Sequence, residues 1–365
     1  MIGWREVFRE AWRDTASGAS RALIGLALFA VGVGALGWAQ ASGVAQVARD
    51  AARWVDAGAS VRIVDFGGAV DGAQCDALAA VEGMVASGAV RPGGSWRLAA
   101  LPSRELKTFE VTPGLAGVLR PSMAEPATGL GVWLSEDLAR AVGAIPGGVL
   151  PVRGSETPVA VAGIFPFPDD DGRSPVLTYS VLEVVPPTGV FDACWVEVWP
   201  ERADTELLGV LVANPLPADE RGQRPLPQVA PLNSSLGTSF GAQARLDRLP
   251  TVALIGAAGV FGLLLGAGLV RLRRLELASA LHAGVDKASL AVQISVETGI
   301  WVGAGAVAAW PVLWWASNGT PDGPWPALFP AVQTVVVAGI AAVLGAVAAI
   351  LATREKHLFR LFKNR

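Results

Sequence analysis

The chain has 365 residues, of which 52 % are hydrophobic and 17 % are charged, and its mean hydropathy is +0.44. This balance excludes an ordinary soluble protein, because the excess of apolar side chains must face lipid. The formal net charge is −3. Since the sequence has no basic stripe and no nucleic-acid-binding module, nucleic acid is not an expected partner.

Four apolar stretches are long enough to cross a bilayer as helices. At about 1.5 Å rise per residue, each covers the roughly 30 Å of hydrocarbon. In lipid only a helix satisfies the hydrogen bonds of such a spanning backbone. The expected spans are residues 21–40, 251–271, 292–316 and 327–352.

The charges that flank these spans predict their direction. Lys and Arg precede the first span, separate the second from the third and follow the fourth, and such residues near span ends stay in the cytoplasm. We therefore expect both termini inside a bacterial cell, with residues 41–250 and the loop 317–326 outside the membrane. Tryptophans typical of a membrane interface fall at the outer span ends: Trp38, Trp310, Trp314, Trp315 and Trp325.

The two ends of the chain carry an amphipathic and a basic segment. Apolar residues of segment 1–20 recur at helical spacing with charges on the other side, which predicts a helix on the inner membrane surface. Residues 353–365 form a basic tail. Alternatively, the first span is a cleaved signal sequence, since Ala39-Gln40-Ala41 fits the cleavage pattern. Its apolar run exceeds the about 7 to 15 residues of a signal core, which favours a span.

Residues 41–250 predict a folded α+β domain. Strand-like alternation and short helical patches follow one another, including a helix with Ser135 as its N-cap and Glu136 and Asp137 in its first turn. Helical apolar spacing continues beyond the first span and returns before the second, so we expect stalk helices. The predicted fold class is four transmembrane α-helices with a large extracytoplasmic α+β domain inserted between helices 1 and 2.

The two cysteines, Cys75 and Cys194, both lie in the part expected outside the cell, where a disulfide persists. A bond between them closes a long loop, worth on the order of 4 to 5 kcal/mol in the chain-entropy model. The alternative is two small buried thiols.

The sequence offers no catalytic machinery, so we do not expect an enzyme. It has no phosphate-binding loop of the P-loop type, and we therefore expect no ATP hydrolysis in this chain. Both histidines, His282 and His357, fall on the expected cytoplasmic side, which excludes a His-based outer site, and we expect neither metal nor cofactor. The run Asp169–Asp171 is interpreted as a solvated turn rather than a calcium loop.

Several glycines fall inside the expected spans. Residues 32–37 match the dinucleotide-binding pattern, but no strand precedes them, so we reject that interpretation. Such glycines instead favour close helix contacts. The candidate pairs are Gly262 with Gly266 and Gly299 with Gly303.

Glu297 is an ionisable residue near the inner end of the third span. Inside a membrane such a group needs a partner or a cavity, which is typical of functional residues. The alternative is that its side chain snorkels to the inner interface. The sequence leaves both interpretations open.

The segment 272–291, between the second and third spans, carries a distinctive pattern. A basic pair is followed by an acid, an apolar helix, a glycine eight positions after the acid, and a further basic residue. These positions are Arg273, Arg274, Glu276, Gly284 and Lys287.

This segment resembles the cytoplasmic loop of MacB/FtsX-type ABC transporter permeases, in which Glu297 also matches a glutamate early in the third span. Leu281 departs from the pattern, because an arginine is usual there. The resemblance extends to the order of one span, a large outer domain and three further spans.

The resemblance implies a permease subunit that segment 272–291 couples to separate cytoplasmic ABC ATPase subunits, which hold the ATP and Mg. A second permease chain, identical or similar, completes the assembly as a dimer. Such permeases transmit the closure of the ATPases to the outer domain, for export or extraction of a peptide, lipid-linked or hydrophobic substrate. Membrane lipid and an extracytoplasmic protein are further implied partners.

Two other functions remain as alternatives. One is a regulator that switches on a cell-wall hydrolase, as the cell-division members of the family do. The other is a membrane receptor without an ATPase. Binding of a cell-wall hydrolase by the outer domain would favour the regulator, and failure of any ATPase to co-purify would favour the receptor.

Overall fold

A computed structural model describes residues 21–123, 131–200, 208–213 and 226–353. The chain forms two compact units, one of residues 1–50 with 242–365 and one of residues 51–241. The expected surface helix 1–20 lies outside the described residues, as does the basic tail beyond Thr353.

Four helical segments are long and apolar enough to cross a membrane, judged by length and composition alone. One precedes the outer domain and three follow it. They are α2 (Ala22–Asp56), the stretch Ala242–Leu272 with α7 (Ala242–Asp247) and α8 (Thr251–Leu272), α10 (Lys287–Ser317) and α11 (Trp325–Ala352). A short helix, α9 (Arg274–His282), lies between α8 and α10.

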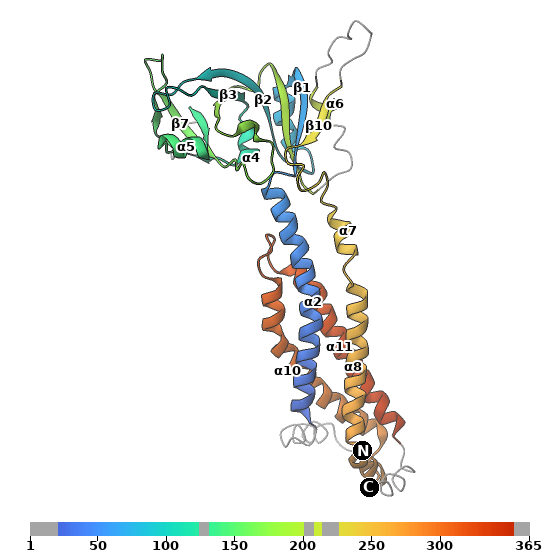
Figure 1. Ribbon diagram of the computed structural model, residues 1–365. Coiled ribbons are helices and arrows are strands. Elements are labelled where there is room, and N and C mark those ends of the chain that lie inside the picture. Colours follow the sequence, from blue (N-terminus) through green and yellow to red (C-terminus); the bar gives the residue numbers. More distant parts are fainter. Residues whose placement is uncertain (1–20, 124–130, 201–207, 214–225, 354–365) are drawn as a thin grey trace. The chain divides into compact units, whose positions relative to one another are not determined.

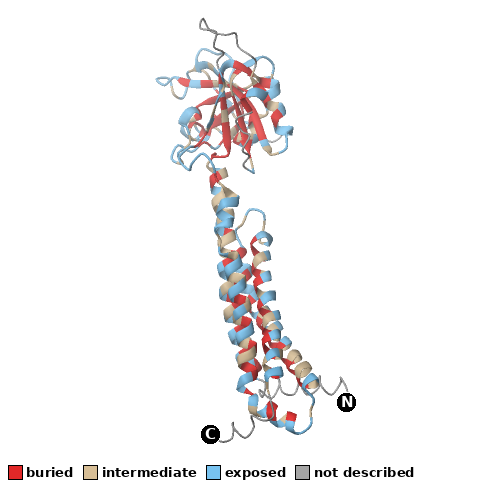
Figure 2. Cartoon of the chain, turned by 90° about the vertical axis from the view of Figure 1, so that its right-hand side faces the viewer, coloured by how far each residue is buried: buried red, intermediate tan, exposed pale blue. Residues whose placement is uncertain are grey.

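These long helices lie side by side in the bundle (Figure 1). Their buried faces share an apolar cluster to which each contributes, and the rings of Phe29 on α2 and Trp301 on α10 meet edge to face at 5.8 Å. The opposite faces are exposed and apolar, visible as pale blue along the helices in Figure 2. Apolar faces of this kind suit a lipid environment.

Glycine brings α8 and α11 into backbone contact. A Cβ added to Gly262 or Gly266 would lie only 2.1 or 2.0 Å from a carbonyl oxygen of α11, and one added to Gly345 would lie 2.1 Å from a carbonyl oxygen of α8. Such close approach is a common means of joining membrane helices. At Gly299 and Gly303, the other expected pair, an added Cβ would meet nothing within 4 Å among the described residues, so no close helix contact depends on these glycines.

The outer unit contains one ten-stranded mixed sheet in the order β10-β1-β9-β2-β3-β8-β5-β7-β4, with β6 paired to β7. Most neighbours are antiparallel, but β3 with β8 and β5 with β7 are parallel. The strands are β1 (Val61–Asp71), β2 (Met84–Trp96), β3 (Leu106–Val111), β4 (Ser122–Met123), β5 (Val132–Ser135), β6 (Val149–Leu150), β7 (Val159–Phe165), β8 (Val181–Val184), β9 (Val190–Val198) and β10 (Gln228–Pro231).

Short helices accompany this sheet: α3 (Gly72–Ala77), α4 (Leu115–Leu119), α5 (Glu136–Val142) and α6 (Leu208–Val212), with single 3-10 turns at Leu78–Ala80 and Pro175–Leu177. Ser135 occupies the N-cap of α5, but its hydroxyl accepts a hydrogen bond from the Ser180 N–H instead of capping the helix. The four candidate spans and this mixed domain confirm the predicted fold class.

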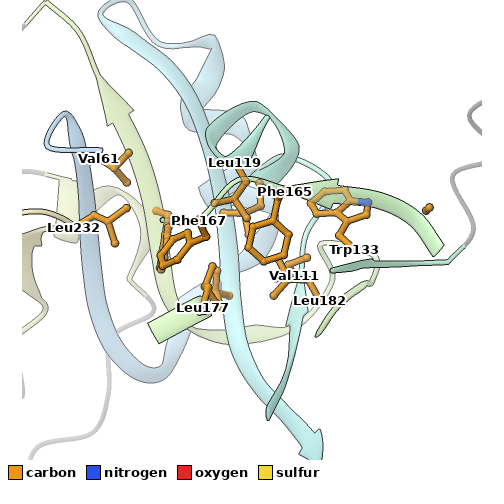
Figure 3. Close-up of a cluster of buried hydrophobic side chains, with 13 residues drawn as sticks. Val61, Val111, Leu119, Trp133, Phe165, Phe167, Leu177, Leu182 and Leu232 are labelled. Atoms are coloured by element: carbon orange, nitrogen blue, oxygen red, sulfur yellow. The ribbon is translucent and has the colours of Figure 1, made fainter. Parts of the chain in front are cut away.

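Three apolar clusters form the core of the outer unit. The first is drawn in Figure 3, where Phe165, Phe167 and Leu177 lie among residues from several strands, with Val61 and Leu232 next to each other at one end. Figure 2 shows the same core as the red interior of this unit.

The second cluster contains the two cysteines. Cys75 on α3 and Cys194 on β9 form a disulfide, with a Cα–Cα distance of 5.8 Å, and both are fully buried. The predicted bond is therefore confirmed, and it joins points 119 residues apart in the sequence. It links the helix after β1 to a central strand of the sheet.

The last turn of α2 belongs to the outer unit and is held there by side chains from three segments. The Asp56 carbonyl accepts a hydrogen bond from Arg173 at 3.1 Å, and the Ala57 carbonyl accepts one from Asn233 at 3.0 Å. Arg62 donates to Ala59 O at 2.9 Å. Carbonyls at a helix C-terminus lack partners within the helix, and cationic donors there are favourable.

Candidate functional site

The candidate site is the connection between α8 and α10. Arg273 is at once the C-cap of α8 and the N-cap of α9, so the chain changes direction at this residue. At the other end, Gly284 has φ +91°, a left-handed conformation that suits glycine, and follows the last turn of α9. Asp286 then caps α10, with its carboxylate accepting from the Ser289 N–H and hydroxyl at 3.0 and 2.6 Å.

A buried ion pair joins this connection to α10. Nη1 of Arg273 lies 2.6 Å from Oε2 of Glu297, and the two side chains are only 8 % and 5 % exposed. Arg273 also donates to Glu276, on the first turn of α9, at 2.7 and 3.1 Å. Gln293 donates to the other Glu297 oxygen at 3.2 Å. One guanidinium therefore connects the end of α8, the start of α9 and the interior of α10.

Arg273 stays positively charged in this environment. Burial disfavours a charged guanidinium, but hydrogen bonds and the negative charges of Glu276 and Glu297 outweigh that effect, so the pKa of Arg273 is raised above its ordinary value. A cavity of about 20 Å³ borders the pair and is lined by Gly266, Leu277, Thr298 and Trp301 among others. That volume suffices for about one water molecule.

Apolar packing fixes α9 against the bundle as well. Leu277 and Leu281 on its inner face belong to a buried cluster with residues of α8, α10 and α11. Leu281, the departure from the family pattern, is thus a core residue here, and an arginine at this position would need a different partner. The helix is held by both a salt bridge and an apolar face.

The remaining predicted residues lie outside the ion-pair network. Arg274 is exposed, and no ion pair of its side chain occurs within the described residues. Lys287 is exposed and its Nζ lies 3.3 Å from the Leu351 carbonyl, near the C-terminal end of α11. Arg271, Arg274, Glu276 and Lys287 thus present charges to solvent along the connection.

The structure brings together Arg273, Glu276 and Glu297, which the sequence had placed in two separate interpretations. Glu297 has Arg273 as a partner, and its side chain is buried. Gln293 was missed, although its position four residues before Glu297 places it on the same helical face. Among the described residues, no group of three or more His, Cys, Asp or Glu side chains is arranged to hold a metal ion.

No family model matches the chain, and no curated protein matches it in sequence. Parts of it resemble solved structures. The periplasmic region of MacB from Actinobacillus actinomycetemcomitans is 11 % identical with a TM-score of 0.30, over 42 % of this chain and 81 % of that one. The extracellular domain of the noncanonic ABC-type transporter YknZ from Gram-positive bacteria is 14 % identical with a TM-score of 0.26, over 40 % and 84 %.

Each of these matches covers less than half of this chain. At such identities and TM-scores they carry no argument about function.

Proposed function

We propose that this chain is the permease subunit of an ABC transporter of the MacB/FtsX type, coupled to separate ATPase subunits through α9. The observation that carries the proposal is the buried Arg273–Glu297 pair, extended to Glu276. It joins a short, charged connecting helix rigidly to a candidate membrane span. In the proposed topology α9 faces the cytoplasm, where the flanking basic residues favour it.

The geometry supports the transmission of force from α9 to α10. A force applied to the exposed side of α9 reaches α10 through an ion pair that is costly to break, since removal of one partner of such a pair costs about 3 to 5 kcal/mol. Leu277 and Leu281 add an apolar contact that resists sliding. The ATPases and their ATP and Mg lie outside this chain, and a second permease chain supplies the other coupling helix.

Arg274 is the residue best suited to test a partner contact. Its side chain is exposed and lies next to the network without belonging to it. A charge reversal, Arg274→Glu, leaves Arg273, Glu276 and Glu297 in place. The matched control is Arg153→Glu, the same change at an exposed position of the outer unit.

The experiment is a mild-detergent pull-down of the tagged full chain, with bound proteins identified and ATP hydrolysis assayed. Wild type and Arg153→Glu should retain an ATPase. With Arg274→Glu the amount of co-purifying ATPase should fall about tenfold, which corresponds to about 1.4 kcal/mol of binding free energy. If no ATPase accompanies the wild type, the proposal fails and the receptor without an ATPase takes its place. An ATPase together with a bound cell-wall hydrolase and no transport indicates the regulator.

A further inference from the structure

A cavity of about 160 Å³ lies in the outer unit, where the last turn of α2 meets the sheet. Its apolar walls include Val61, Leu119 and Leu232, which also belong to the core cluster of Figure 3. For comparison, an engineered apolar cavity of about 150 Å³ accommodates benzene. The space is therefore large enough for a small side chain or organic ligand.

One wall of this cavity carries a buried carboxylate with spare hydrogen-bonding capacity. Glu197 on β9 is 3 % exposed, and both of its oxygens accept from a single nitrogen, Nη2 of Arg120, at 2.7 and 2.8 Å. An ionised carboxylate offers about four lone-pair sites. Buried acceptors normally use their capacity, so the unused sites point to a further donor.

The charge of Glu197 is also incompletely compensated. Its partner Arg120 is 54 % exposed, so water screens the attraction. Asp56 adds a second negative charge to the lining of the cavity. Burial raises the pKa of Glu197, while Arg120 opposes the shift and Asp56 reinforces it. The other arginine of the lining, Arg173, is already paired with Asp171 at 2.5 Å.

We propose that this cavity binds a guanidinium or ammonium group on a short apolar stem, with Glu197 as the acceptor of its hydrogen bonds. The apolar walls suit the stem and the carboxylate suits the cation. Such a group is carried by the Arg or Lys side chain of a peptide and by a small free amine or guanidine, and both sources share this chemistry. The inference does not depend on an ATPase partner.

The test is isothermal calorimetry on the full chain in lipid nanodiscs. The probes are butylguanidinium, its neutral analogue butylurea, the anion butyrate, and the capped peptide acetyl-Gly-Arg-Gly-amide. Butylguanidinium should bind and butylurea should not. Tighter binding of the peptide than of butylguanidinium identifies a polypeptide side chain as the source, and the reverse order identifies a small free cation.

Three variants distinguish this site from a merely structural ion pair. Glu197→Gln keeps the shape and should weaken binding about tenfold or more, because a neutral amide replaces the charged acceptor of the hydrogen bond. Arg120→Gln removes the competing cation and should tighten it. Val118→Trp, at a half-buried position of the lining, should block the cavity without changing its charge.

The control variant is Glu156→Gln, the same substitution in an exposed loop, which should bind as wild type does. The proposal is overturned if neither cationic probe binds the wild type, or if Glu197→Gln binds them equally well. Binding of butyrate that is lost in Arg120→Gln would also overturn it, because the cavity would then be an anion site.

Discussion

Among the described residues, two Arg–Glu pairs have buried carboxylates, one pair in each unit, and they differ in how exposed the arginine is. In the bundle, Arg273 is almost as buried as Glu297 and connects three helices. In the outer unit, Arg120 is half exposed and Glu197 faces a cavity. The pair in the bundle stabilises the packing of the helices. In the pair of the outer unit, one side of the carboxylate remains accessible to another donor.

The largest difference between the pairs should appear when the carboxylates are removed. Glu297→Ala removes the buried partner of Arg273 and leaves only the exposed Glu276, so it should destabilise the chain by about 3 to 5 kcal/mol. Glu197→Ala leaves Arg120 free to turn to water and should cost much less. Thermal unfolding of both variants in the same detergent measures the difference, and equal losses would contradict the distinction.

The disulfide sharpens the comparison, because it acts on the outer unit alone. Replacing both Cys75 and Cys194 by alanine should lower stability by about 2 to 4 kcal/mol. Limited proteolysis should show cleavage at lower urea concentration within residues 51–241 and an unchanged bundle. Reduced wild type is the matched control and should behave like the double variant.

A double replacement separates the stability of the bundle from its function. Arg273→Met combined with Glu297→Leu removes both charges, and such replacements of buried pairs are often neutral or stabilising. Stability should therefore recover relative to Glu297→Ala. ATPase stimulation by the purified complex should stay low, because the link to Glu276 is absent. Full stimulation in the double variant would show that packing alone transmits the force.

The smallest expected effects are those of pH, and they have opposite signs in the two units. The raised pKa of Glu197 means that its contribution to stability is full below the ordinary value of 4.5 and is lost as the pH rises through the raised value. Hydrogen bonds from Ser289 lower the pKa of Asp286, so its contribution is present above the ordinary value of 3.8 and is lost as the pH falls through the lowered one.

Stability measured between pH 3 and pH 7 checks both signs. Glu197→Gln should abolish the loss at the higher pH, and Asp286→Asn should flatten the loss at the lower pH. The same slope in wild type and in either variant would refute the corresponding assignment.

Apolar length and sequence order were enough to predict the fold class, because a membrane span is a local property of about 20 residues. The disulfide also followed from the sequence, since only two cysteines are present. The sheet order was out of reach: β1 pairs with β9 and β10, far away in the chain, and no local pattern encodes such pairings.

The candidate site was predicted in parts. Glu297 could be predicted because it is a charged residue in an apolar stretch, and the pattern of segment 272–291 indicated Arg273 and Glu276. Their meeting depends on how α10 packs against the end of α8, which spacing alone does not give. Glu197 and Arg120 could not be predicted as a site, because a single acid in an alternating strand resembles any solvent-facing residue.

The anchoring of α2 has a practical consequence for work on the outer unit. A soluble fragment that starts after residue 56 would leave Arg173 without its carbonyl acceptor and would remove Trp54, whose ring lies 5.8 Å from that of Trp199 and 6.0 Å from that of Phe240. The natural boundaries for expression therefore lie inside the helix, before Ala51, and at or beyond Gly241. Fragments cut at the first strand would expose aromatic surface and tend to aggregate.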